Sequence, residues 1–149
     1  MRFGGNSKRS ERGRVMWKTS LAIICAAAGL LVSGCGETEN PGTVLPLTDD
    51  TFDKAIAKGV VLVDFWGPWC EPCKPQRVIV AELAAETAGQ KGLRFANINL
   101  GNETGTISRF DLEYVPTLIL FKDGKPIKTF EGLTQKEDLR TALDEGLKR

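Results

Sequence analysis

Cys70 and Cys73 are the residues of this chain whose type and spacing could do chemistry. Two cysteines separated by two residues across the start of a helix can close a disulfide, and the positive end of the helix dipole stabilises a thiolate on the exposed first sulfur. The spacing therefore predicts dithiol-disulfide exchange. In this hypothesis Cys70 attacks a disulfide of another molecule, and Cys73 resolves the mixed disulfide that forms.

Two other interpretations of the cysteine pair are half of a zinc site and an inert structural disulfide. Zinc is normally held by four ligands. The chain has four cysteines and no histidine, and no second pair completes a site with Cys70 and Cys73. We therefore expect no metal. The lack of histidine also excludes histidine-dependent metal sites and Cys-His nucleophilic catalysis. An inert disulfide stays open at this point.

The cysteine pair lies between a predicted strand and a predicted helix. Val60–Trp66 reads VVLVDFW and is apolar on both faces, which is typical of a central strand covered on two sides. A helix is expected over residues 71–88, with Gly89 ending it and Pro75 bending its first turns. Its buried stripe includes Val80, Leu83 and Ala84.

In the rest of the domain, short apolar runs alternate with amphipathic stretches, which indicates strands separated by helices. The other expected strands are Val44–Leu47 at an edge, Leu93–Asn99, Thr117–Lys122 and 127–131, with a hairpin turn over 122–125. The other expected helices are one capped by Thr48 and ended by Gly59, one over 104–110, and one that begins at Thr134 with a capping box to Glu137. This order predicts the α/β class, with a mixed β-sheet flanked by helices on both faces.

Three segments around these residues resemble the thioredoxin family. They are Val63-Asp64-Phe65-Trp66, the Trp-Cys-x-x-Cys-Lys run over residues 69–74, and Val115-Pro116-Thr117. The match covers residues 44–147. The resemblance implies the thioredoxin fold and a thiol-disulfide oxidoreductase that uses no cofactor besides its own redox-active cysteine pair.

The resemblance also implies roles for single residues. Asp64 lies in an apolar run, where burial raises the pKa of a carboxyl without a partner. The family would use it as the base that helps deprotonate Cys73; the other interpretation is a solvated acid at a strand end. A cis bond before Pro116 would place the Val115 backbone against the cysteines as a docking edge for substrate. Trp69 would border the groove in which the substrate docks.

Two positions depart from the family pattern. Glu71 stands where the family usually has glycine, and its carboxylate opposes a thiolate on Cys70. Together with Pro72, which matches the family, Glu71 is expected to tune the redox potential, giving a more reducing couple than glycine would. Asn97 stands where the family often has a lysine, so the common ion pair with Asp64 is missing.

The first 35 residues read as an export signal. Residues 21–32 carry no charge and are too short to span a bilayer, which is typical of a signal-peptide core. Val32-Ser33-Gly34-Cys35 resembles the bacterial lipobox, which implies cleavage before Cys35 and lipid on that cysteine. Translation from Met16 would give a more compact signal. A plain secretory signal and an uncleaved anchor are the other interpretations.

We therefore expect a signal peptide over 1–34, a lipidated cysteine and flexible tether over 35–43, and a thioredoxin-like domain over 44–149. Several acyl chains on one residue give durable attachment to a membrane. The expected protein is an exported lipoprotein, anchored in a membrane and facing the periplasm or the cell exterior.

The charge of the chain argues against nucleic acid as a partner. Of the charged side chains, 14 of the 20 basic and 18 of the 19 acidic ones follow Gly34, a net charge of −4. A mildly acidic domain gives no electrostatic case for binding nucleic acid.

The function expected from these features is reduction of disulfides in exported client proteins, with electrons supplied by a membrane thiol carrier. One alternative is a disulfide oxidase, because an oxidising compartment favours it. The other is a redox-inert binding or chaperone module built on the same fold.

Overall fold

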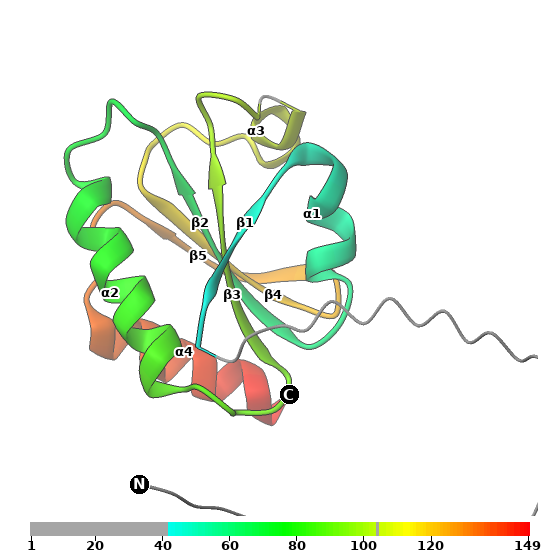
Figure 1. The fold of residues 1–149 in the computed structure, drawn as a ribbon. Helices are drawn as coiled ribbons and strands as arrows, with labels where there is room; N and C mark the ends of the chain where they lie inside the picture. The colour runs from blue at the N-terminus through cyan, green and yellow to red at the C-terminus, as the bar shows by residue number, and fades with distance from the viewer. Residues whose placement is uncertain (1–41, 104) are drawn as a thin grey trace, which may run out of the picture. The chain divides into compact units, whose positions relative to one another are not determined.

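The structure is a computed structural model that describes residues 42–103 and 105–149. Its elements in chain order are β1 (Val44–Leu47), α1 (Asp49–Ile56), β2 (Val60–Trp66), α2 (Cys73–Glu86), β3 (Leu93–Asn99), α3 (Gly105–Phe110), β4 (Thr117–Lys122), β5 (Lys125–Glu131) and α4 (Lys136–Lys148), drawn in Figure 1. The expected signal peptide, Cys35, Met16 and the tether up to residue 41 lie outside the described residues.

The five strands form one mixed sheet in the order β1-β3-β2-β4-β5. β3 pairs in parallel with both β1 and β2, whereas β4 pairs antiparallel with β2 and with β5. The prediction that β1 lies at an edge and β2 in the middle is confirmed. Every residue of β2 before Trp66 is buried, as expected for a strand that is apolar on both faces.

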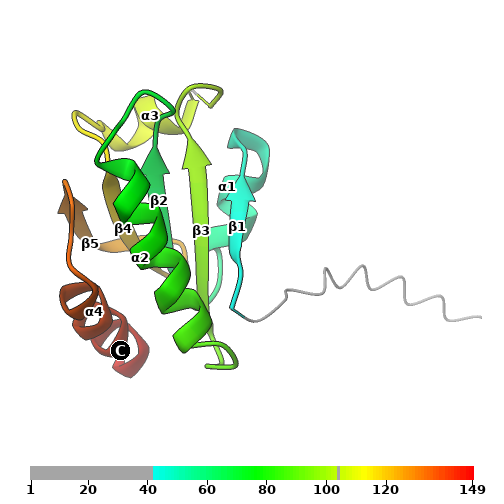
Figure 2. The same ribbon diagram turned by 60° about the vertical axis from the view of Figure 1, so that its left-hand side comes forward.

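Helices cover both faces of the sheet, as Figures 1 and 2 show. On the face covered by α1 and α3, four aromatic rings pack together: Phe52, Phe65, Phe110 and Phe121. On the face covered by α2 and α4, Val60 and Leu62 of β2 pack against the buried stripes of both helices. Because side chains alternate along a strand, Asp64 and Trp66 also point to the α2 face.

Helix α2 starts two residues later and ends two residues earlier than predicted. Pro72 occupies the position before it, with φ −68°. The first four N–H groups of a helix have no intrahelical partner, so a proline there removes no hydrogen bond. Pro75 is the third residue of the observed helix, and the bend expected from it is therefore not required.

The N-cap of helix α4 is Gln135, one residue later than the predicted Thr134. The Thr134 hydroxyl donates instead to the carbonyl oxygen of Gly132 (3.2 Å), and the Thr134 N–H donates to Oε1 of Gln76 (2.7 Å). The predicted capping box with Glu137 is wrong, because Thr134 is engaged in the turn that precedes the helix.

Asp123 and Gly124 form the predicted turn between β4 and β5. Both have positive φ, 46° and 81°, which is typical of a two-residue hairpin turn. β5 follows at once, earlier than predicted, and includes Pro126. An edge strand tolerates a proline, and the strand register shifts beside it, between Leu120 and Phe121.

No helix in residues 42–103 or 105–149 is long and apolar enough to cross a membrane.

Candidate active site

Cys70 and Cys73 lie where the chain passes from the end of β2 to the start of α2. They form a disulfide, with their Cα atoms 5.4 Å apart. The backbone N–H of Cys73 donates to Sγ of Cys70 at 3.2 Å. Hydrogen bonding and the helix dipole stabilise a thiolate in that position once the disulfide is reduced.

Cys70 is the more accessible of the two residues, but it is only 7 % exposed, against 1 % for Cys73. This is less exposure than the sequence led us to expect. In the disulfide the Cys70 sulfur is held against the first turn of α2 by its bond to Cys73. Cys70 is therefore the less buried residue of the pair.

Asp64 is 1 % exposed, so the interpretation as a solvated acid is wrong. Within the described residues neither carboxylate oxygen of Asp64 has a hydrogen-bond partner. Burial raises the pKa of Asp64 to about 7, and the positive charge of Arg77 offsets part of that rise. A carboxyl that titrates near neutrality is suited to proton transfer.

A cavity of about 440 Å³ lies beside Asp64. Its polar lining comes from Lys74 and Arg77 of α2 and Asn97 of β3. Four apolar residues complete it: Val44, Val78, Val80 and Ala81. A cavity of this size with polar groups in its wall has room for water, which can link a buried carboxyl to solvent.

Asn97 is the direct register partner of Asp64 in the β2-β3 pair, so the β3 position beside Asp64 holds a neutral amide. Oδ1 of Asn97 accepts a hydrogen bond from Nε1 of Trp66 at 3.2 Å. The guanidinium carbon of Arg77 lies 4.1 Å from the centre of the Trp66 ring. Trp66 is thus packed among polar groups.

Arg77 is a site residue that the sequence did not single out. It lies four residues after Cys73, one helical turn further along α2. That spacing was a usable signal, but an arginine on a helix is most often a solvated surface residue.

Val115 and Pro116 are joined by a cis peptide bond, as the resemblance implies. They precede β4, whose first residue Thr117 pairs with Phe65 near the carboxyl end of β2. The structure therefore brings this segment to the same end of the sheet as the cysteines. The carbonyl oxygen of Pro116 is engaged by the N–H of Gly132 at 2.8 Å.

Three large apolar side chains are exposed at this end of the sheet: Trp69 (65 %), Tyr114 (61 %) and Leu133 (47 %). Trp69 precedes Cys70, and Tyr114 precedes the cis bond. Leu133 follows Gly132, whose N–H donates to the carbonyl oxygen of Pro116. Exposed apolar groups in one region are typical of a surface that binds other proteins. Tyr114 and Leu133 were not recognised from the sequence, because isolated apolar residues in loops carry no periodic signal.

Glu71 forms an ion pair with Lys74, whose Nζ lies 2.8 Å and 3.0 Å from the two carboxylate oxygens. Both side chains are well exposed. The cation offsets part of the negative charge that Glu71 places beside Cys70, so the effect of Glu71 on the potential is smaller than for an unpaired carboxylate.

Glu71→Gly is expected to make the couple less reducing, raising the potential by less than about 30 mV, because a tenfold change in the equilibrium constant corresponds to about 30 mV. Equilibration of the purified proteins with a glutathione redox buffer measures the difference. Glu113→Gly, at an exposed acid before the cis bond, is the control and should leave the potential in place. A potential in Glu71→Gly equal to or below that of the native protein would contradict the prediction.

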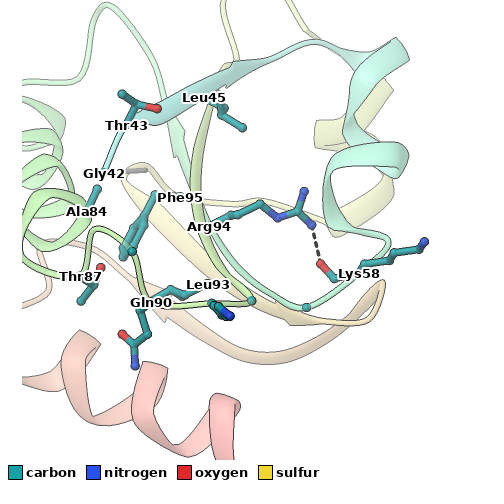
Figure 3. A pocket seen from close by; sticks show the side chains of 14 residues that line it. Gly42, Thr43, Leu45, Lys58, Ala84, Thr87, Gln90, Leu93, Arg94 and Phe95 are labelled. Carbon is teal, nitrogen blue, oxygen red and sulfur yellow. Dashed lines mark hydrogen bonds between the residues drawn. The ribbon is translucent and has the colours of Figure 1, made fainter. Parts of the chain in front are cut away.

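A second cavity, also about 440 Å³, lies at the opposite end of the sheet. Its lining includes Gly59, which precedes β2, and Leu93, the first residue of β3. Figure 3 shows Arg94 reaching across its wall, with a hydrogen bond from the guanidinium to the carbonyl oxygen of Lys58. The residues that line this cavity include no cysteine and no acid. It therefore contributes no thiol or carboxyl to the exchange chemistry.

A Cys-x-x-Cys disulfide at the junction of a central strand and a helix, in a sheet of this topology, defines the class of thiol-disulfide oxidoreductases with the thioredoxin fold. Comparison with known proteins agrees. The family model Thioredoxin matches residues 43–145, and this chain belongs to the thioredoxin family.

The relatives include bacterial thioredoxins. The thioredoxin of Staphylococcus haemolyticus is 38 % identical over 104 residues, which cover 70 % of this chain and 98 % of the relative. The thioredoxin of Staphylococcus aureus strain N315 is 36 % identical over 104 residues, with the same coverage of both chains. The resemblance seen in the sequence is confirmed.

Proposed function

We propose that this protein reduces disulfides of exported client proteins. The observation that carries the proposal is the Cys70-Cys73 disulfide at the start of α2 with a buried carboxyl, Asp64, on the same face of the sheet. The domain also aligns with nearly the whole length of relatives named thioredoxin. That alignment supports a thioredoxin-like reductant over an oxidase, whose relatives usually carry a helical insertion.

In the proposed reaction the reduced protein attacks first through Cys70. The Cys70 thiolate bonds to one sulfur of the client disulfide, and the other client sulfur leaves as a thiolate and takes up a proton. Asp64 then accepts the proton of the Cys73 thiol, directly or through a water in the adjoining cavity. Cys73 attacks the Cys70 sulfur and releases the second client thiol. The client gains two electrons, and the Cys70-Cys73 pair loses two.

The client docks at the exposed apolar surface beside the cysteines. Trp69 and the Val115 backbone before Pro116 lie at the same end of the sheet as the disulfide. An extended client segment forms main-chain hydrogen bonds with the Val115 backbone, and its side chains contact the exposed rings.

The protein acts at a membrane in this proposal. The lipobox-like residues 32–35 support removal of the signal peptide over 1–34 and lipid attachment to Cys35. The tether over 35–43 then holds the domain over 44–149 outside the cytoplasm. A membrane thiol carrier returns two electrons to the Cys70-Cys73 disulfide after each cycle, since each client disulfide leaves that pair oxidised.

The direction of electron flow is tested by the redox state of the cysteine pair in intact cells. Acid quenching followed by alkylation with a thiol reagent of high mass separates reduced from oxidised protein on a gel. We expect mostly reduced Cys70 and Cys73, with the double variant Cys70→Ser/Cys73→Ser marking the unshifted band. A mostly oxidised pair would overturn the reductase and favour the disulfide oxidase.

The same cells test location. The native protein should appear in the membrane fraction and incorporate labelled palmitate, whereas Cys35→Ala should do neither. Cys25→Ala is the matched control, because Cys25 lies inside the apolar core of the signal. Equal labelling of the native protein and Cys35→Ala would refute the lipid anchor without bearing on the redox chemistry.

A further inference from the structure

We propose that Arg77 is the positioning residue that supplies to Asp64 the positive charge which β3 does not carry. The proposal deepens the proposed function, because it concerns how the base of the exchange reaction is held in its working protonation state. Only the expected effect of Arg77 on the rate of resolution depends on the proposed role of Asp64 as base. The effect of Arg77 on the ionisation of Asp64 does not.

The fold places Arg77 and Asp64 on the same cavity. Asp64 and its register partner Asn97 both point to the α2 face, since Leu62 and Phe95, two residues before each, pack in the core on that side. Arg77 comes to this cavity from α2. The β3 neighbour of Asp64, Asn97, is thus neutral, and the cation, Arg77, comes from helix α2.

The side chain of Arg77 is held in place by Trp66. Its guanidinium carbon lies 4.1 Å from the ring centre, within the range of a cation-π contact. Trp66 is fixed in turn by its hydrogen bond to Asn97. A long arginine would otherwise extend into solvent, where water screens its charge. The stack keeps the charge beside the carboxyl.

The other groups that face Asp64 do not replace this charge. β4 presents the apolar Leu118 as register partner, and β1 lines the cavity with Val44. Neither β1 nor β4 therefore places an opposite charge beside Asp64.

Lys74 is the second cation on the cavity, and its charge is already engaged. Its Nζ lies within 3.0 Å of both carboxylate oxygens of Glu71. Within residues 42–103 and 105–149, Arg77 makes no direct ion pair. The positive charge of Arg77 lowers the pKa of Asp64 against the larger, opposite effect of burial. Arg77 thus keeps Asp64 partly ionised at neutral pH.

The test is a direct titration of Asp64 in the full-length protein. Carboxyl carbon resonances of the native protein and of Arg77→Met are followed by NMR across the neutral range. We expect the Asp64 midpoint in Arg77→Met to move up by about half a unit or more, because an opposite charge nearby favours the ionised form. Methionine keeps an unbranched apolar chain over Trp66, so packing is largely conserved.

Two further variants separate the effect of the Arg77 charge on Asp64 from a general structural effect of the substitution. Arg109→Met removes an arginine that lies over the Phe52 and Phe110 rings on the other face of the sheet, and it should leave the Asp64 midpoint unchanged. Asn97→Lys in the Arg77→Met background returns a cation at the register partner, and it should bring the midpoint back down.

The consequence for catalysis is a change in the pH profile of resolution. A midpoint raised by half a unit to one unit leaves less ionised Asp64, so resolution in Arg77→Met should be about two- to fivefold slower at pH 7 and equal to native above about pH 9.

An Asp64 midpoint in Arg77→Met equal to that of the native protein would overturn the proposal. A raised midpoint with resolution rates identical at every pH would support the charge pairing, and would instead overturn the role of Asp64 as base.

Discussion

Cys73→Ser is expected to leave client polypeptides covalently bound to Cys70, with turnover reduced roughly a thousandfold or more. Attack by Cys70 needs only its own thiolate, but release of the client needs a second sulfur within bonding distance. In the native protein that sulfur is Cys73, the first residue of α2 and 1 % exposed. Serine at this position cannot form the disulfide that expels the client, so the mixed disulfide accumulates.

The conjugates are measured by mass spectrometry after incubation of the reduced variant with oxidised insulin, and in cell extracts by non-reducing gels. Cys70→Ser is the matched control. It should capture almost none, because the remaining sulfur is the less accessible one. Equal capture by both variants, or no capture by Cys73→Ser, would contradict the assignment of Cys70 as attacking sulfur and with it the proposed reaction.

Asp64→Asn is expected to slow resolution of the mixed disulfide about a hundredfold at pH 7 while leaving the initial attack by Cys70 close to native. Asparagine has nearly the shape of aspartate but cannot take a proton from the Cys73 thiol. In the native protein the resolution rate should rise with pH around a midpoint of about 7, the pKa of Asp64.

Rapid mixing with a labelled disulfide peptide separates the two steps, because formation and decay of the mixed disulfide are read in one trace. Asp111→Asn, at an exposed carboxyl in the loop after α3, is the control and should match the native protein in both phases. If attack and resolution slow by the same factor in Asp64→Asn, the carboxyl acts on the site as a whole and not on the Cys73 proton.

The stability of Asp64→Asn gives an independent test of the raised pKa of Asp64. Burial raises its pKa from 3.8 to about 7, so the folded chain holds a proton there that the unfolded chain has lost. This contribution to stability is complete below about pH 4 and is lost as the pH rises to about 7. The loss is about 4 kcal/mol, at about 1.4 kcal/mol per pH unit.

Urea unfolding of the oxidised proteins measures this effect. Relative to the native protein, Asp64→Asn should gain about 4 kcal/mol in free energy of unfolding between pH 4 and pH 8. Other titrating groups such as Glu86 and Lys136 cancel in this comparison, because both proteins contain them. A difference that stays constant with pH would mean that Asp64 titrates near its ordinary pKa.

Much of the fold could be predicted because its signals are local. Val60–Trp66 is apolar at every position except Asp64, and a continuous run of that kind reads as a central strand wherever it occurs. The turn at Asp123 and Gly124 carries its backbone preference in two residues.

Helix boundaries were less accurate, since they depend on distant contacts. The start of α4 is displaced because the N–H of Thr134 donates to Gln76, a residue 58 positions earlier.

By itself the sequence determined the cysteine pair and predicted the burial of Asp64, because both follow from residue type and from position on a strand or helix. The neutral residue at Asn97 was recognised through the resemblance to the family. Only the tertiary structure decided that Arg77 lies over Trp66 beside the Asp64 cavity. It also decided that Lys74 pairs with Glu71 and that exposed Tyr114 and Leu133 lie at the cysteine end of the sheet. The reason is that such placements depend on how helices pack across strands, which brings together side chains far apart in sequence.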